Sequence, residues 1–289
     1  MKILVIGNGL LATSIIERLE IEEHELLVYS RRFGGGIRSR QVVGDIFDFE
    51  SFVENLSWRP QVIIQTAWIT THGIYTNDPS NFRYAQFTSD LARFIAETDV
   101  EHLIVLGSCA EYGPQVGPST AGITKLNPNN LYAEQKVVAF NSTKNSLFGS
   151  EVRLTWARIF QPYGLGQDKR RLLPSLISVL RNGEEVHLTN TSSILDWITT
   201  RDVASAISWI INCDTPIEVD IGTSIGVTNI ELLKLLEGLL GNTTQWIGIA
   251  GQNSFTQDVA IAGKNSPLFK SGWLPSDSLK SGLEWVLGL

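Results

Sequence analysis

The chain opens with MKILVIGNGLLATSIIERLEIEEHELLVYSRR (residues 1–32), and this stretch decides the fold. Residues 2–6 form a short apolar run that ends at a glycine, and residues 10–19 carry apolar side chains at helical spacing. A second apolar run follows at residues 25–29. A buried strand, a glycine turn, a helix and another strand in this order are typical of the start of a parallel α/β sheet.

The same alternation continues outward from this stretch. Further strands are predicted at residues 41–43, 61–65, 102–106 and 152–159, and helices at 48–56, 82–98 and 131–148. Strands that alternate with helices predict a doubly wound parallel sheet with right-handed crossovers.

Beyond residue 160 the regular alternation of strands and helices ends. A glycine-containing loop is predicted at residues 161–169, and the segments after it are predicted as a helix at 170–181, a strand at 186–188, a helix at 201–211, a strand at 216–221, a helix at 229–239 and a last helix at 276–287. Thr228 stands where the N-cap of the helix at 229–239 is expected.

Composition excludes several classes of protein. With 43% hydrophobic and 18% charged residues the 289-residue chain is globular, and its net charge of −7 argues against binding to a nucleic-acid backbone. No apolar stretch reaches the ~18–20 residues of a membrane span. Cys109 and Cys213 are too few for a disulfide framework or a metal cluster. We expect a cytoplasmic protein with no metal, membrane or nucleic-acid partner.

The glycine turn carries the first chemical motif, GNGLLA at residues 7–12. Gly7 permits a tight turn, Gly9 lets a pyrophosphate approach the backbone, and the small Ala12 lets the helix pack closely on the sheet. The free N–H groups of the helix N-terminus favour an anion. This pattern predicts a dinucleotide site on a Rossmann-type sheet.

The end of the second strand predicts which dinucleotide binds. A site for NAD usually has an acidic residue there, which binds the ribose 2′-hydroxyl. Here the strand runs into Arg31 and Arg32, whose guanidinium groups suit a 2′-phosphate. Asp45 and Ile46, after the next strand, are candidates to flank the adenine. We therefore expect NADP(H) to be favoured over NAD(H).

A tyrosine and a lysine four residues apart supply candidate proton-transfer chemistry. Tyr132 and Lys136 lie on one face of the helix at 131–148, where a nearby ammonium lowers the pKa of a phenol. Tyr132 then exchanges a proton with a carbonyl or hydroxyl group. Ser108 follows the strand at 102–106, at the edge of the sheet where ligands bind, and is placed to donate a hydrogen bond to the same substrate oxygen.

Together these motifs resemble the extended short-chain dehydrogenases/reductases, specifically the NAD-dependent epimerase/dehydratase family that acts on nucleotide sugars. The resemblance covers nearly the whole chain and also rests on RIFQPYG at residues 158–164, DWITTRDVA at 196–204 and IGT at 221–223. It implies a Rossmann domain at residues 1–160, to which 190–224 return. Residues 161–189 and 225–289 would form a smaller α+β substrate-binding subdomain.

The resemblance also implies site residues and an assembly. Ser108, Tyr132 and Lys136 would be catalytic, and Ser108, Gln161 and Arg171 would contact the substrate. The residues expected at the cofactor are Gly7, Asn8, Gly9, Leu10, Leu11, Ala12, Arg31, Arg32, Asp45, Ile46, Thr66, Ala67, Tyr132, Lys136, Ile159 and Phe160. The helices at 82–98 and 131–148 resemble the family's dimer-forming pair, which implies a homodimer.

Departures from the family pattern narrow the reaction. Cys109 and Ala110 stand where dehydratases of the family carry an acidic pair, so dehydration is disfavoured. We interpret Cys109 as a small buried thiol rather than a proton-transfer residue. Leu195 replaces an arginine that binds the substrate diphosphate, and Gln161 replaces an asparagine. Either Arg170, Arg171 or another cation from the second part of the chain compensates for the lost arginine, or the substrate carries no nucleotide.

These observations predict an NADPH-dependent reductase of a carbonyl on a sugar-like substrate, with a nucleotide-linked 4-keto-6-deoxy-hexose as the favoured substrate. An NAD-dependent nucleotide-sugar epimerase is the alternative enzyme. A protein that senses NADP(H) without turnover is the alternative from another class, and it has no need of the proton donor Tyr132.

Overall fold

The computed structural model describes residues 1–244, 246–249 and 259–289. Residues 245 and 250–258, part of the predicted substrate-binding subdomain, lie outside the described residues. Within the described part of the chain, no helix is both long enough and apolar enough to cross a membrane.

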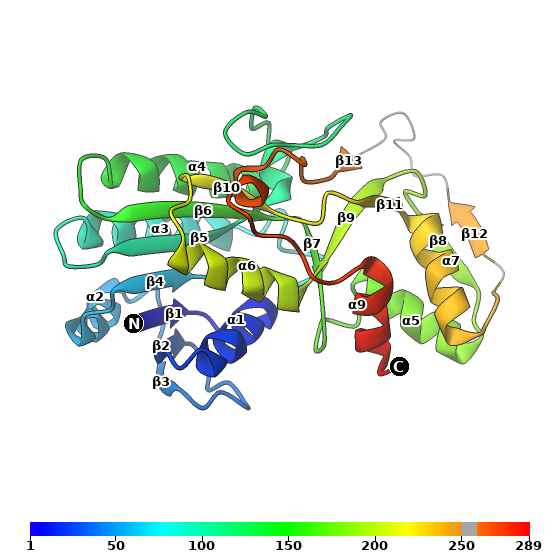
Figure 1. Cartoon of the computed structure of the whole chain (residues 1–289), viewed down its shortest axis with the longest axis horizontal. Helices are drawn as coiled ribbons and strands as arrows, with labels where there is room; N and C mark the ends of the chain where they lie inside the picture. The colour runs from blue at the N-terminus through cyan, green and yellow to red at the C-terminus, as the bar shows by residue number, and fades with distance from the viewer. Residues whose placement is uncertain (245, 250–258) are drawn as a thin grey trace.

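A seven-stranded sheet in which every neighbouring pair is parallel forms the larger part of the molecule (Figure 1). In spatial order its strands are β10 (Glu218–Ile221), β6 (Arg153–Ile159), β5 (His102–Ser108), β4 (Val62–Gln65), β1 (Lys2–Ile6), β2 (Glu25–Ser30) and β3 (Arg40–Val43). The order reverses at β1, as a doubly wound sheet requires. The predicted fold class is confirmed.

Helices cover both faces of this sheet and bury its apolar runs. On one face α1 (Leu10–Ile21) and α6 (Thr200–Asn212) pack over one set of alternating strand residues. On the other face lie α2 (Phe49–Glu54), α3 (Ser80–Ile95) and α4 (Leu131–Ser146). A short 3-10 helix, η1 (Asn55–Trp58), follows α2, and another, η2 (Cys109–Tyr112), follows β5. Because both faces are covered, the strands are apolar on both sides.

The rest of the chain forms a smaller region beside the carboxyl ends of the strands (Figure 1). Its strands are β7 (Gln161–Tyr163), β9 (Ile194–Thr199), β11 (Gly226–Thr228) and β13 (Val259–Ala260) in one small sheet, and β8 (Val186–Thr189) and β12 (Trp246–Ile249) in another. Its helices are α5 (Leu172–Asn182), α7 (Asn229–Leu240) and α9 (Leu279–Leu287), whereas α8 (Pro267–Lys270) packs against β10 of the larger sheet. Thr228 caps α7 with a reciprocal bond to Glu231, as the sequence predicted.

Two expectations for this region are corrected. The segment at 161–169 is not all loop, because β7 pairs with β9 through residues 161–163. β9 itself was not predicted, although it pairs with β7, β11 and β13. β7 has only three residues, and the partners of both strands lie far away in the sequence, so the local apolar pattern does not reveal them.

Candidate functional site

The turn between β1 and α1 is built for close approach to a ligand. Gly7 has a φ of +111°, and a Cβ atom there would collide with the Thr66 hydroxyl. Gly9 is the N-cap of α1 and has open space where a side chain would stand. Ala12 is buried against the sheet. At Gly9 no side chain of the described residues stands between the N-terminus of α1 and the space in front of it, which fits the pyrophosphate of a dinucleotide.

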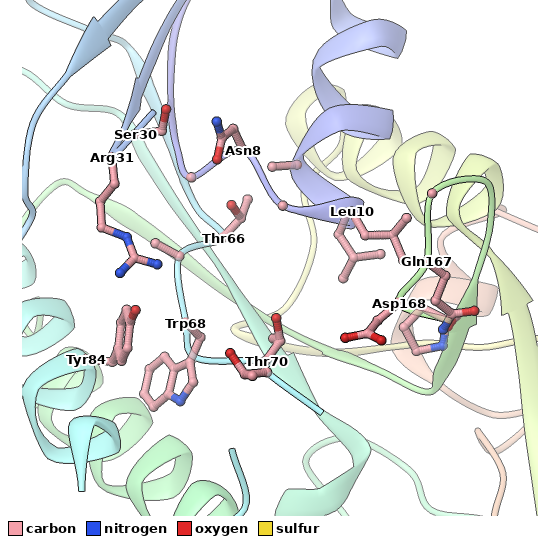
Figure 2. A pocket seen from close by; sticks show the side chains of 18 of the residues that line it. Asn8, Leu10, Ser30, Arg31, Thr66, Trp68, Thr70, Tyr84, Gln167 and Asp168 are labelled. Carbon is pink, nitrogen blue, oxygen red and sulfur yellow. The ribbon is translucent and has the colours of Figure 1, made fainter. Parts of the chain in front are cut away.

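A cleft of about 500 Å³ runs past this turn (Figure 2). One wall is the glycine turn with the ends of β2 and β4, and the other is the loop that precedes α5. The residues that line it are Gly7, Asn8, Gly9, Leu10, Leu11, Ala12, Tyr29, Ser30, Arg31, Ile46, Phe47, Thr66, Ala67, Trp68, Thr70, Thr71, Tyr84, Pro162, Gly166, Gln167, Asp168, Arg170 and Arg171. Most residues expected at the cofactor lie here.

The two arginines after β2 differ in position. Arg31 extends into the cleft in front of Tyr84 (Figure 2). Arg32 is not among the described residues that line the cleft, and its backbone carbonyl accepts bonds from Asn8 Nδ2 at 2.7 Å and Ser30 Oγ at 2.6 Å. The geometry therefore offers the guanidinium of Arg31 to a ligand, while Arg32 secures the loop.

Of the residues predicted near the adenine and the nicotinamide, some line the cleft and others do not. Ile46 lines the cleft, whereas Asp45 bonds its own loop through Phe47 N at 3.1 Å. Ile159 and Phe160 are buried in the apolar core and do not line the cleft as it is described. Their apolar side chains pack under the sheet edge and support it.

The three predicted catalytic residues come from two neighbouring elements. Ser108 ends β5, and Tyr132 and Lys136 lie in the first turns of α4. Lys136 is 3% exposed, donates to the Leu106 carbonyl at 2.5 Å and stands 5.9 Å from the Tyr132 ring centre. The Ser108 hydroxyl accepts a bond from Ala110 N at 3.2 Å. The structure thus brings the three side chains to the carboxyl edge of one sheet.

The pKa values of this group correct one expectation. We expected Lys136 to lower the pKa of Tyr132, but burial raises the pKa of that phenol, and a bond with Ser108 opposes the rise without cancelling it. Burial also lowers the pKa of Lys136 to about 7, and the negative charge of Glu111 opposes that change. Tyr132 is therefore a protonated donor at neutral pH.

Aromatic side chains stand between this group and the cleft. Trp68 lines the cleft, stacks on Tyr84 with ring centres 5.7 Å apart and holds the Lys136 ammonium 3.8 Å from its ring centre. Tyr75 meets Tyr132 edge to face at 5.1 Å. Ser108, Tyr132 and Lys136 are not among the described residues that line the cleft. Sequence reasoning missed Trp68, although it follows β4 at the same sheet edge as Ser108.

Cys109 is half-buried, so its interpretation as a small buried thiol holds only in part. Burial of the thiol group, together with the carboxylates of Asp196, Glu111 and Asp220, raises the pKa of Cys109 to about 12. A thiol with this pKa carries almost no thiolate at neutral pH, so it is a poor nucleophile and a poor base.

Among the described residues that line the cleft, Arg170 and Arg171 are the cations on the proposed substrate side, but neither stands at the position of Leu195, where the family has an arginine. Leu195 lies in β9 and packs against the apolar core of the smaller region. Arg171 lines the cleft, donates to the Thr70 carbonyl at 3.1 Å and lies 5.4 Å from the Tyr75 ring centre. Arg170 is paired with Asp168 at 2.6 Å. Arg171 thus reaches from the smaller region toward the segment beside Tyr132.

Comparisons with known proteins agree on the fold. The model of the NAD dependent epimerase/dehydratase family matches residues 3–222. The UDP-glucose 4-epimerase of Thermotoga maritima, solved with UDP-glucose, has a TM-score of 0.87 at 20% identity and covers 100% of this chain and 98% of that chain. The Thermus thermophilus UDP-glucose 4-epimerase, solved with NAD, gives 0.83 at 20% identity over 100% and 98% of the two chains.

A third similar structure is the dTDP-glucose 4,6-dehydratase of Bacillus anthracis, solved with NAD. Its TM-score is 0.82 at 19% identity, over 100% of this chain and 96% of that chain. At these identities the structural similarity shows a common fold and leaves the reaction to the site residues.

Proposed function

This chain belongs to the NAD-dependent epimerase/dehydratase family, and from that premise we propose that it is an NADPH-dependent reductase of a carbonyl on a nucleotide-linked 4-keto-6-deoxy-hexose. The cofactor part of the proposal is supported by Arg31, which lines the cleft after β2 where a carboxylate would favour NAD. The observation that carries the reaction is the placement of Tyr132 and Lys136 on α4 beside Ser108 at the end of β5.

The proposed site residues fit a nicotinamide dinucleotide. The glycine turn and the N-terminus of α1 would bind the pyrophosphate, Ile46 and Tyr84 would contact the adenosine half, and Arg31 would bind the 2′-phosphate. When bound, the cofactor supplies a hydride for the carbonyl carbon. All other steps belong to the protein.

Proton transfer is assigned to Tyr132. As the carbonyl carbon gains the hydride, the carbonyl oxygen takes the proton of the Tyr132 phenol, and the product is a secondary alcohol. Ser108 orients the carbonyl oxygen by a hydrogen bond. The protonated form of Lys136 stabilises the phenolate left on Tyr132 until that phenolate takes a proton from water. A phenol that is protonated at neutral pH is already in the form that this direction needs, whereas an epimerase must begin by removing a proton from its substrate.

We assign recognition of the substrate diphosphate to Arg171. An anionic diphosphate in a cleft needs a charged partner, and Leu195 cannot provide one. Arg171 reaches the segment beside Tyr132, whereas Arg170 is already neutralised by Asp168. The proposal also includes Gln161 as a substrate contact. A homodimer through α3 and α4 is part of the proposal too, because Phe82, Phe94 and Val138 are exposed on these helices.

The second candidate, an NAD-dependent epimerase, is favoured by one observation, the similarity to two UDP-glucose 4-epimerases. One assay separates the two candidates. The protein is given a nucleotide-linked 4-keto-6-deoxy-hexose with NADPH or with NADH, and loss of reduced cofactor is followed. We expect stoichiometric oxidation of NADPH and formation of the alcohol. Interconversion of UDP-sugars without net consumption of cofactor would favour the epimerase.

A further inference from the structure

A buried carboxylate lies directly beneath the proposed catalytic residues. Glu111 belongs to η2, the turn that follows β5, and its side chain is 0% exposed. A charge buried this completely is costly unless it is paired and hydrogen-bonded. The proposed mechanism gives Glu111 no task, so its partners indicate what it does.

Glu111 accepts hydrogen bonds from three different donors. The backbone N–H of Ser108 donates at 2.8 Å, the Trp156 indole at 3.0 Å and Arg158 Nε at 2.7 Å. Gly107 permits this approach, since a Cβ atom there would stand 2.8 Å from Glu111 Oε1 and 2.5 Å from the indole nitrogen. One carboxylate therefore ties the backbone of Ser108 to β6.

The charges around this carboxylate are asymmetric. Arg158 has a second partner, Glu218 of β10, which its Nη1 meets at 2.7 Å and which is 21% exposed. On the other side of Arg158, Tyr112 donates to Asp220 at 2.6 Å, and burial raises the pKa of Asp220 to about 6. Glu111 and Glu218 thus share one arginine, but only Glu111 also bonds Ser108.

The Lys136 side chain bonds the same end of β5 that Glu111 holds. The groups that face the Lys136 ammonium are the Leu106 carbonyl from β5, the Trp68 ring after β4 and the Tyr132 ring on its own helix. Among the described residues, Glu111 is the group whose negative charge opposes the effect of burial on the pKa of Lys136. Without that charge the lysine would be largely neutral at pH 7, and a neutral amine cannot stabilise a phenolate.

We propose that Glu111 is a positioning residue, which fixes the end of β5 that carries both Ser108 and the Leu106 carbonyl bonded by Lys136. This inference rests on the proposed function, in which Ser108 orients the carbonyl and Lys136 stabilises the phenolate of Tyr132. Glu111 touches neither substrate nor cofactor in this role and acts through these two residues.

Two matched variants test it. Glu111→Gln and Glu218→Gln each remove one carboxylate from Arg158 and leave the other. The titration of Lys136 is followed by NMR of protein with isotope-labelled lysine, and Lys136→Met assigns the signal. We expect the pKa of Lys136 to fall by about one unit in Glu111→Gln and to stay unchanged in Glu218→Gln. Equal Lys136 pKa values in both variants and in the unmodified protein would overturn the proposal.

Turnover gives an independent readout. With the keto-sugar and NADPH, Glu111→Gln should lower kcat by about tenfold or more, with the alkaline limb of the pH profile moved to lower pH, and leave KM for NADPH unchanged. Equal losses of kcat in the two variants would also overturn the proposal. The lysine titration needs no turnover, so an unmodified protein that does not reduce the keto-sugar would defeat the proposed function alone.

A third variant covers the case in which Glu111→Gln does not fold. Glu111→Asp keeps the charge but withdraws the carboxylate from the Ser108 N–H. Hydrogen exchange at the Ser108 amide should then become faster than in the unmodified protein, while Lys136 titrates as before. Unchanged protection of that amide in a folded Glu111→Asp protein would contradict the positioning of Ser108.

Discussion

The two ends of β5 each adjoin a buried side chain with a depressed pKa, and the two side chains have different tasks. At the amino end, burial and the charge of Arg153 lower the pKa of His102 to about 3. At the carboxyl end, burial lowers the pKa of Lys136 to about 7, and the charge of Glu111 opposes it. Arg153 lowers the pKa of His102 in the same direction as burial does, whereas Glu111 opposes the effect of burial on the pKa of Lys136.

Hydrogen-bond partners explain the contrast. Arg153 donates to His102 Nδ1 at 2.8 Å, so Nε2 carries the proton and bonds Thr155 at 2.8 Å. Both ring nitrogens are thereby occupied in a neutral ring. Lys136 lies beside a phenol at the sheet edge that also borders the cleft. A perturbed pKa alone therefore does not identify a functional group, and its place on the sheet decides between the two roles.

The largest effect on turnover is expected from a change at the carboxyl end of β5. Tyr132→Phe removes the proposed proton donor and keeps the ring that packs against Trp68 and Tyr75. Turnover of the keto-sugar should fall by about 10²–10⁴-fold. Stability and NADPH affinity should stay close to those of the unmodified protein. A fully active Tyr132→Phe enzyme would remove the carboxyl end of β5 from the mechanism.

The next effect concerns the cofactor cleft. Arg31→Ala should weaken NADPH binding by about 10–150-fold, since a charge-assisted hydrogen bond contributes roughly 1.5–3 kcal/mol. Arg32→Ala is the matched control, because Arg32 uses its backbone carbonyl and does not line the cleft. Isothermal titration of each variant with NADPH and NADH measures this. A larger loss from Arg32→Ala than from Arg31→Ala would reverse the assignment.

A smaller effect is expected on the substrate side. Arg171→Ala should raise KM for the nucleotide sugar by about tenfold with little change in kcat, which is the result of losing uniform binding. Arg170→Ala should change KM less, because Arg170 is paired with Asp168. Inhibition by free nucleoside diphosphates is the supporting measurement. If they do not compete at millimolar concentration, the nucleotide part of the proposed substrate is wrong and the reductase part stands.

The smallest effect on turnover is expected at the amino end of β5. His102→Gln should leave kcat unchanged, yet it should alter how stability depends on pH. The folded pKa of His102 lies below its ordinary value of 6.5, so the unfolded chain binds the extra proton as the pH falls below 6.5. The free energy of unfolding should therefore decline toward acid pH, by up to about 1.4 kcal/mol per pH unit from this group.

Urea unfolding of both proteins between pH 7 and pH 4 isolates this contribution. Asp220 acts in the opposite direction below pH 6, because its folded pKa is raised from 3.8 to about 6 and the folded state holds that proton. Since Asp220 is present in both proteins, the difference between them reports His102. An identical pH dependence in the two proteins would show that His102 is not held neutral.

The first half of the chain could be predicted well because its signals are local. An apolar run, a glycine and a helical repeat identified β1 and α1 with little error, and the cleft-lining role of Arg31 followed from its place after β2. By contrast, β9 pairs with three strands distant in the sequence, and no local pattern marks it. Within β9, the buried Asp196 accepts hydrogen bonds from the backbone N–H groups of Thr223, Ser224 and Ala262.

In the candidate site too, features that depend on residues distant in the sequence could not be predicted. Glu111 reads as a solvated loop residue until Arg158, far along the chain, is placed against it. The pKa of Tyr132 was predicted in the wrong direction, because the sequence shows its lysine neighbour but not the burial that outweighs it. Charges can be read from a sequence, whereas the solvent that is excluded around them depends on the whole fold.

The central claim is that the cleft prefers the phosphorylated cofactor, and one measurement tests it most directly. The dissociation constants of NADPH and NADH are determined for the unmodified protein at one ionic strength. The account predicts that NADPH binds at least about tenfold more tightly, the contribution of one charge-assisted contact from Arg31 to the 2′-phosphate. Equal dissociation constants, or tighter binding of NADH, would contradict it.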